Sequence, residues 1–139
     1  MKLAQHSLEV RTDGPGLYEM TSDVAGWVSA QRVERGLLTV FLSHTSASLL
    51  IQENADPDVR ADLQQFFERL VPEDPRRYRH TAEGADDMPS HIKAALTQVQ
   101  LSIPIERGRL GLGTWQGIYI FEHRHAPHRR QVSLTLIGE

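Results

Sequence analysis

The chain has 139 residues, a mass of 15.7 kDa and a formal net charge of −3, from 15 Lys and Arg against 18 Asp and Glu. That length predicts a single domain, residues 1–139, and excludes a (β/α)₈ barrel, which needs about 200 residues or more. The absence of cysteine excludes disulfides, thiolate metal sites and a cysteine nucleophile, and the mild acidity argues against nucleic acid as a partner. No apolar run approaches signal-peptide length or the roughly 20 residues of a membrane span, so we expect no membrane partner and a cytoplasmic location.

The first predicted elements are a strand, a helix and two further strands. Residues 2–11 form a predicted edge strand that ends before the turn cluster Asp13–Gly16. A helix is predicted over 22–35, with Gly36 closing it. The apolar run 37–43 predicts a strand buried on both faces, and a second strand is expected over 48–53.

The clearest helix in the sequence follows Asp56, which is a good N-cap residue and precedes a proline at the first helical position. Its apolar residues repeat at helical spacing, namely Val59, Leu63, Phe66 and Leu70. Residues 73–88 are polar without periodicity. A short helix is then predicted from Met88 to Leu96, with Asp86 or Asp87 near its cap.

The remainder of the chain is predicted to be β-structure. One strand is expected over 101–105, and the strand 118–124 is expected to pair with 131–137 across the loop 125–129. The order of elements predicts an α+β domain with a mixed β-sheet of about seven strands and two to three helices.

The end of the apolar run carries more polar side chains than packing requires. His44, Ser46 and Ser48 would point to one face of an extended chain. They are compatible with a turn whose hydroxyls satisfy local backbone groups, with a Ser–His nucleophile pair, or with anion or metal binding. No nucleophile-elbow pattern accompanies them.

A second polar segment, residues 78–91, holds two histidines and three carboxylates. His80 and His91 with one of the carboxylates could bind Zn²⁺ or another divalent ion and leave a position open. The alternative is structural, because Asp86 and Asp87 lie where helix caps belong.

A third segment, residues 108–117, is rich in glycine and fits either tight β-turns or a loop whose N–H groups reach an anion. Glu122 and Arg124 then continue an apolar strand face, which suggests an internal ion pair or a cleft wall. The segment 123–130, with three His and three Arg, is expected to be a solvated hairpin loop or a phosphate-binding loop.

Taken together, these segments resemble the YjbQ family, whose members are called secondary thiamine-phosphate synthases. The resemblance covers about residues 7–139 and is carried by four motifs, which are His44–Leu49, Glu53–Pro57, Glu83–Lys93 and Gly113–Gly117. It implies an α+β domain that assembles as a homotrimer, with sites completed by residues from two subunits. It also implies that the histidines of the first two polar segments, 44–48 and 78–91, converge on a metal, with His44, His80 and His91 as ligands.

The first functional hypothesis is an enzyme that joins a pyrimidine pyrophosphate to a thiazole phosphate. Such a reaction needs a divalent ion such as Mg²⁺, cationic groups around the phosphates and a pocket for the ring. The residues expected to contact substrate are Ser46, Ser48, Asn54, Trp115, Gln116, Arg124 and Arg130, and the carboxylates expected to hold the ion are Glu83, Asp86 and Asp87.

Two alternatives remain open at this point. One is a metal-dependent hydrolase of a phosphate ester or amide, with Zn or Mg on the three histidines and Glu122 as base; the residues expected to be catalytic are His44, Asp86 and Glu122. The other is a non-catalytic trimer that binds a small anionic metabolite.

Overall fold

The computed structural model describes all 139 residues. It contains eight strands, three α-helices and one 3₁₀ helix. In chain order these are β1 (Lys2–Asp13), β2 (Gly16–Glu19), α1 (Thr21–Ala30), β3 (Arg35–Leu42), β4 (Ala47–Glu53), α2 (Pro57–Leu70), η1 (Pro75–Arg77), α3 (Asp87–Leu96), β5 (Gln100–Glu106), β6 (Arg109–Leu110), β7 (Gln116–Glu122) and β8 (Pro127–Gly138).

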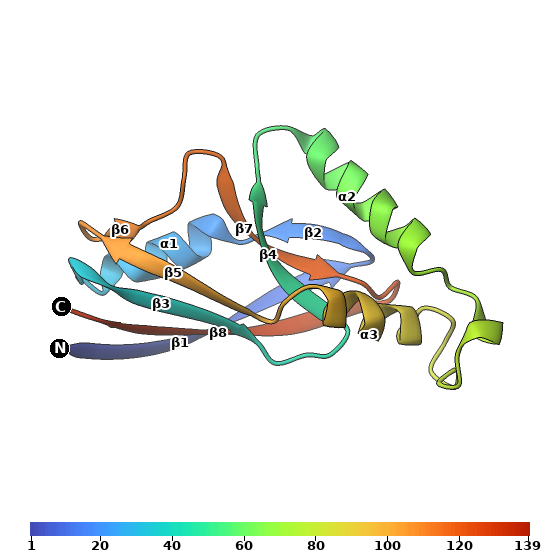
Figure 1. The fold of residues 1–139 in the computed structure, drawn as a ribbon. Helices are drawn as coiled ribbons and strands as arrows, with labels where there is room; N and C mark the ends of the chain where they lie inside the picture. Colours follow the sequence, from blue (N-terminus) through green and yellow to red (C-terminus); the bar gives the residue numbers. More distant parts are fainter.

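The strands form two sheets (Figure 1). The larger has the order β1-β8-β3-β5-β6 and the smaller has the order β2-β7-β4. The α+β class is confirmed. The sheet arrangement differs from the expected single mixed sheet, because every strand pair is antiparallel and the strands divide between two sheets.

The core lies between the two sheets. Leu38 and Val40 of β3 and Leu134 of β8 are fully buried, as are Leu49 of β4 and Ile120 of β7. β3 alternates between buried and more exposed residues, so the expectation that it is buried on both faces is wrong. β7 is instead the strand whose residues are buried almost without interruption.

Several predicted elements are confirmed, while the helix α1 is shorter than expected. β1 is an edge strand, and Asp56 caps α2 by accepting a hydrogen bond from the Asp58 N–H at 2.9 Å. α1 ends at Ala30, and Gly36 lies inside β3 rather than closing the helix. A Cβ at Gly36 would lie 2.3 Å from the Ile137 carbonyl oxygen, so strand packing explains this glycine.

The predicted hairpin between 118–124 and 131–137 is wrong. β7 pairs with β2 and β4, whereas β8 pairs with β1 and β3 in the other sheet. Residues 123–126 therefore cross from one sheet to the other. This crossing is tied to the start of α3, because Arg124 donates hydrogen bonds to Asp86 and Asp87.

The helix α2 lies on the outside of the fold and contains no fully buried residue. Phe67 packs edge-on against Phe121 of β7, with ring centroids 5.3 Å apart, while Phe66 and Leu70 are about half exposed. No helix of the protein combines the length and the apolar character that a membrane span requires.

Candidate functional site

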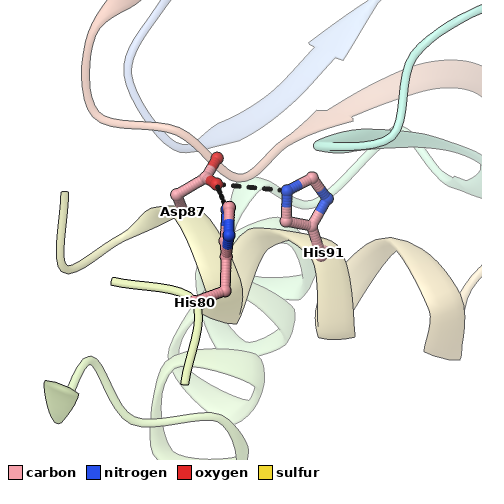
Figure 2. A group of neighbouring side chains, drawn as sticks. All are labelled: His80, Asp87 and His91. Atoms are coloured by element: carbon pink, nitrogen blue, oxygen red, sulfur yellow. Dashed lines mark hydrogen bonds and ion pairs between the residues drawn. The ribbon is translucent and has the colours of Figure 1, made fainter. Parts of the chain in front are cut away.

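Three side chains converge where the loop after η1 meets the first turns of α3 (Figure 2). Asp87 begins α3, and His91 follows four residues later, so both lie on one helix face. His80 approaches from the loop. The Asp87 Oδ2 atom lies 2.5 Å from His80 Nε2 and 3.2 Å from His91 Nε2.

Hydrogen bonds from outside the cluster fix the orientation of two of its side chains, His91 and Asp87. The Nδ1–H of His91 donates to the Thr45 carbonyl oxygen at 2.9 Å, which leaves His91 Nε2 as the atom facing Asp87. The other Asp87 oxygen, Oδ1, accepts from Arg124 Nη1 at 2.6 Å. Metal ligands in proteins are commonly oriented by such outer partners, with histidine donating its second N–H to a carbonyl.

The electrostatics of the cluster keep the carboxylate ionised. Burial alone would raise the pKa of Asp87, but the hydrogen bond from His80 and the charge of Arg124 hold it below its usual value. The hydrogen bond with Asp87 raises the pKa of His80. Negative charge is therefore concentrated at the point where two imidazole nitrogens meet.

The geometry of the cluster fits a metal ion. One ligand atom each from His80, Asp87 and His91 lies within 4.8 Å of the others. Two imidazoles and one carboxylate suit a divalent transition metal and leave coordination positions open. The Glu83 carboxylate lies beside them, with Oε2 3.3 Å from His80 Nε2.

His44 lies outside this cluster, although the resemblance implied that it joins His80 and His91. Its Nε2 accepts a hydrogen bond from the Gln131 N–H at 2.8 Å, which ties the ring to β8. Burial, together with the charge of Arg130, lowers the pKa of His44, so the ring is held neutral. Asp87 occupies the place in the cluster that the resemblance gave to His44.

Arg124 and Asp86 hold the cluster in place from behind. Arg124 Nε donates to Asp86 Oδ2 at 2.9 Å, and its Nη2 donates to the Glu83 carbonyl at 3.1 Å. Asp86 also accepts from the His125 N–H at 2.9 Å. These contacts make Arg124 and Asp86 positioning residues. They occupy the Arg124 guanidinium, which was expected to bind phosphate, and the Asp86 carboxylate, which was expected to be catalytic.

Glu122 and Arg130 form a fully buried ion pair. The sequence left an internal ion pair open for Glu122 but with Arg124, whose side chain binds Asp86 and Asp87 instead. Arg130 Nε donates to Glu122 Oε1 at 2.7 Å and Nη2 donates to Oε2 at 2.5 Å. Thr12 donates a further hydrogen bond to Glu122. Burial alone would raise the pKa of Glu122, but Arg130 and Thr12 hold it below its usual value. Neither side chain is exposed to a substrate within one chain.

The hydroxyl groups of Ser46 and Ser48 are also engaged in hydrogen bonds within the protein. Ser46 Oγ accepts from Arg130 Nη2 at 3.0 Å, which extends the buried ion pair. Ser48 Oγ is 3.0 Å from His123 Nε2, and both side chains are buried. Burial lowers the pKa of His123 to about 3. A Ser–His pair therefore exists, but it uses His123 rather than His44 and lies inside the core.

Asn54, Trp115 and Gln116 lie at the other end of the small sheet. Within that sheet, Ala47 pairs with Glu122 at one end and Glu53 pairs with Gln116 at the other. Seven residues of strand separate these ends by about 20 Å. Trp115 is 62% exposed, and the Asn54 N–H donates to its carbonyl oxygen at 3.0 Å.

A large open cavity adjoins the cluster of His80, Asp87 and His91. It has a volume of about 670 Å³ and is lined by His44, Thr45 and His91 together with apolar residues of β3 and α3, including Phe41, Leu42 and Ala94. His91 thus belongs both to this cluster and to a cavity large enough for a small organic molecule.

Sequence reasoning left the carboxylate beside His80 and His91 open among Glu83, Asp86 and Asp87. The spacing of Asp87 and His91, four residues apart on a predicted helix, was a sufficient signal to choose Asp87. Lys93 gave no such signal: the structure buries it, and burial lowers its pKa although Glu73 and Glu68 act in the opposite direction.

Comparisons with known proteins agree on one family. The family model described as "UPF0047 protein YjbQ-like" matches residues 6–139. A UPF0047 protein of Synechocystis sp. is 56% identical over 97% of this chain and 92% of its own length. The YjbQ protein of Salmonella typhimurium is 46% identical over 97% of this chain and 98% of its own.

Solved structures agree with the fold. A hypothetical protein from Aeropyrum pernix superimposes with a TM-score of 0.89 at 30% identity, covering 98% of this chain and 99% of that one. A conserved hypothetical protein from Thermus thermophilus gives a TM-score of 0.84 at 36% identity, covering 95% and 99%. The names of these relatives state no activity.

Proposed function

The chain belongs to the UPF0047 YjbQ-like family, and from that premise we propose that it is a metal-dependent hydrolase of a small phosphate ester or amide. The observation that carries this proposal is the convergence of His80 Nε2, Asp87 Oδ2 and His91 Nε2 within 4.8 Å. Each of these atoms points at the same place, and Thr45 and Arg124 hold two of the side chains from behind.

The cavity lined by His91 supports a small ester or amide as the substrate. Of the three cluster residues His91 lines this cavity, and much of the remaining wall is apolar, so the reacting group of a substrate would face His91 while an organic group packs against Phe41 and Ala94. An ester or amide with one polar reacting group and one apolar substituent fits that division.

The protein's own residues divide the work of hydrolysis. A divalent ion held by His80, Asp87 and His91 would supply Lewis acidity toward the substrate oxygen. Glu83 lies 3.3 Å from His80, largely in solvent, where its carboxylate accepts the proton of the attacking water. Arg124 keeps Asp87 ionised and in position.

The transferase hypothesis draws less support from the positions of its residues. It requires Glu83, Asp86 and Asp87 for the ion, Arg124 and Arg130 for the phosphates and Trp115 for the ring. Asp86 and Arg124 are paired with each other, and Arg130 is paired with buried Glu122. Trp115 lies at the far end of the small sheet, so this activity would require Trp115 from a neighbouring copy.

We also propose that the chain self-associates as the homotrimer that the family resemblance implies. The outer face of the large sheet supports association, because Leu3, Ile137 and Leu37 lie in register across β1, β8 and β3 and are about half exposed or more. A row of aliphatic side chains across three strands is the kind of surface that a partner covers.

A substrate screen tests the hydrolase proposal. Protein loaded with Zn²⁺ or Mn²⁺ is assayed against panels of phosphate monoesters, phosphate diesters and amides. We expect turnover of at least one panel member, falling at least about 100-fold in His91→Ala and remaining unchanged in His6→Ala, a control histidine on β1 whose ring stacks on Trp27. Silence across all three panels with one metal bound per chain would contradict hydrolysis and favour a binding role.

A further inference from the structure

Lys93 lies in an unusual position on α3. The side chain is only 4% exposed, and no hydrogen bond or ion pair in the structure involves its Nζ atom. Gln64 Oε1 is the one side-chain polar atom that is both fully enclosed and without a partner. The Lys93 amine also lacks a partner, so it is not fully enclosed and keeps some access to solvent. A nearly buried lysine without a counter-ion is rare, because burial of an unpaired charge is costly.

Lys93 lines a separate cavity of about 310 Å³, through which its amine reaches solvent. It is lined by Pro15, Glu68, Val71, Glu73, Lys93 and His125, and none of these belongs to the metal cluster or to the larger cavity beside His91. The cavity is small, with room for a ligand on the order of ten non-hydrogen atoms at about 30 Å³ each.

The other polar side chains of this cavity already have hydrogen-bond partners. Glu73 Oε1 lies 2.6 Å from His125 Nε2, and Glu68 Oε1 accepts from Gln64 Nε2 at 3.0 Å. Neither carboxylate bonds to Lys93. The cavity therefore presents one free amine beside a carboxylate–imidazole pair that can give and take a proton.

From this arrangement we propose that Lys93 forms a reversible imine with a small, neutral aldehyde or ketone bound in this cavity. The two glutamates of the wall disfavour an anionic ligand, and the single unpaired donor suits a carbonyl oxygen. The site is independent of the proposed hydrolase site, since it shares no residue with it.

The reaction balances without an oxidant or a reductant. The Lys93 nitrogen attacks the carbonyl carbon, a C–N bond forms, and the carbonyl oxygen takes up the proton released by the amine. His125, paired with Glu73, then protonates that oxygen, which leaves as water while the nitrogen lone pair forms the C=N bond of a protonated iminium. The iminium nitrogen returns its proton to His125, which restores the imidazole–carboxylate pair and leaves the neutral imine. One amine and one carbonyl compound give one imine and one water.

The sequence makes the test unusually clean, because Lys2 and Lys93 are the only lysines. Intact protein is incubated with propionaldehyde and sodium cyanoborohydride, which converts any imine into a stable secondary amine, and adducts at each lysine are quantified by peptide mass spectrometry. A chelator is present throughout, so that failure of the metal site cannot affect the result. Lys2, on the exposed N-terminal strand, is the internal control.

We expect Lys93 to be trapped about tenfold faster than Lys2 or more, with a rate that saturates as propionaldehyde increases, because the cavity holds the carbonyl beside the amine. In denaturant the two lysines should react at equal rates. Native Lys93 reacting no faster than Lys2 would overturn the proposal.

Two further arms define the ligand class and control for folding. Glyoxylate, an anionic aldehyde, should favour Lys93 over Lys2 less than propionaldehyde does, and a stronger preference would overturn the assignment of a neutral ligand. Lys93→Arg and the uncharged Lys93→Met should both leave trapping at Lys2 unchanged. Adducts at Lys93 in wild type, compared before and after unfolding, keep the test decisive even if both variants fold poorly.

Discussion

Asp87 is the residue on which the proposed metal site depends most. Its two oxygens face different partners, since Oδ1 accepts from Arg124 while Oδ2 faces both His80 and His91. The side chain is only 3% exposed, so the surrounding hydrogen bonds rather than solvent set its orientation. A buried carboxylate held in this way is a preorganised ligand, and its neighbours determine how well it binds a cation.

The buried pair of Glu122 and Arg130 is structural. Arg130→Met is expected to destabilise the protein by about 3–5 kcal/mol, because Glu122 would keep its charge in the core without a counter-ion. The free energy of unfolding, measured in urea, checks this. The matched control is Arg35→Met at the exposed pair with Glu139, where we expect a change within about 0.5 kcal/mol. Equal effects at both positions would contradict a structural role for the buried pair.

His123 makes the stability of the fold depend on pH. Its pKa is about 3 in the folded protein, against an ordinary value near 6.5, so the unfolded chain binds the extra proton between these values. Its contribution is complete above pH 6.5 and is lost as the pH falls toward 3. Between pH 7 and pH 5 this loss is about 2 kcal/mol.

The variant His123→Gln isolates this contribution, because His44 acts in the same direction and His80 in the opposite one. We expect the variant to lose about 2 kcal/mol less than wild type between pH 7 and pH 5, as measured by urea unfolding at each pH. Parallel pH profiles for the two proteins would show that His123 is not held neutral in the core.

At the scale of elements, the crossing between the sheets joins the loop before α3 to the rest of the fold. Arg124 lies on this crossing and binds Asp86, Asp87 and the Glu83 carbonyl together. Removal of these contacts should loosen residues 78–86 without changing any ligand of the metal. Arg124→Gln is therefore expected to weaken Zn²⁺ affinity about 10- to 100-fold.

Calorimetric titration and hydrogen exchange of the loop 78–86 together check this prediction. Arg129→Gln, five residues further along the chain and paired with exposed Glu9, is the control and should change neither measurement. A loosened loop with unchanged Zn²⁺ affinity would mean that Asp87 needs no support from Arg124.

The sequence predicts elements well where the signal is local. Asp56 and the proline after it define the start of α2, and the strand 48–53 and the helix from Met88 to Leu96 lie where they were expected. The pairing of strands is predicted less well, because it depends on tertiary contacts. The proximity of 118–124 and 131–137 in the chain favours a hairpin, but β7 is buried almost throughout and packs between β2 and β4 instead.

The same contrast between local signals and tertiary pairing applies to the candidate site. His80 and His91 were predicted as ligands and do converge, whereas Asp87 replaces His44 because the ring of His44 bonds to the backbone of β8. Hydrogen bonds of that kind depend on which strands lie side by side. Arg124 and Arg130 were likewise expected to bind phosphate, and only the tertiary structure shows that Asp86 holds Arg124 and Glu122 holds Arg130.

For the whole molecule, the proposed homotrimer makes a direct prediction. Light scattering of the purified protein should give about 47 kDa, which is three times 15.7 kDa. Ile137→Asp, which places a charge in the exposed aliphatic row, should shift the mass toward that of one chain, because a buried unpaired carboxylate disfavours association. Leu70→Asp on α2 is the control, and a mass of 15.7 kDa for wild type would contradict the proposal.

The central claim is that His80, Asp87 and His91 bind one divalent metal ion. Calorimetric titration of metal-free protein with Zn²⁺ tests it most directly. We expect one site per chain in wild type, abolished in the double variant His80→Ala/His91→Ala and retained in the double variant His6→Ala/His128→Ala, which removes two histidines outside the cluster. Absence of Zn²⁺ binding in wild type, or equal binding by both double variants, would contradict the claim.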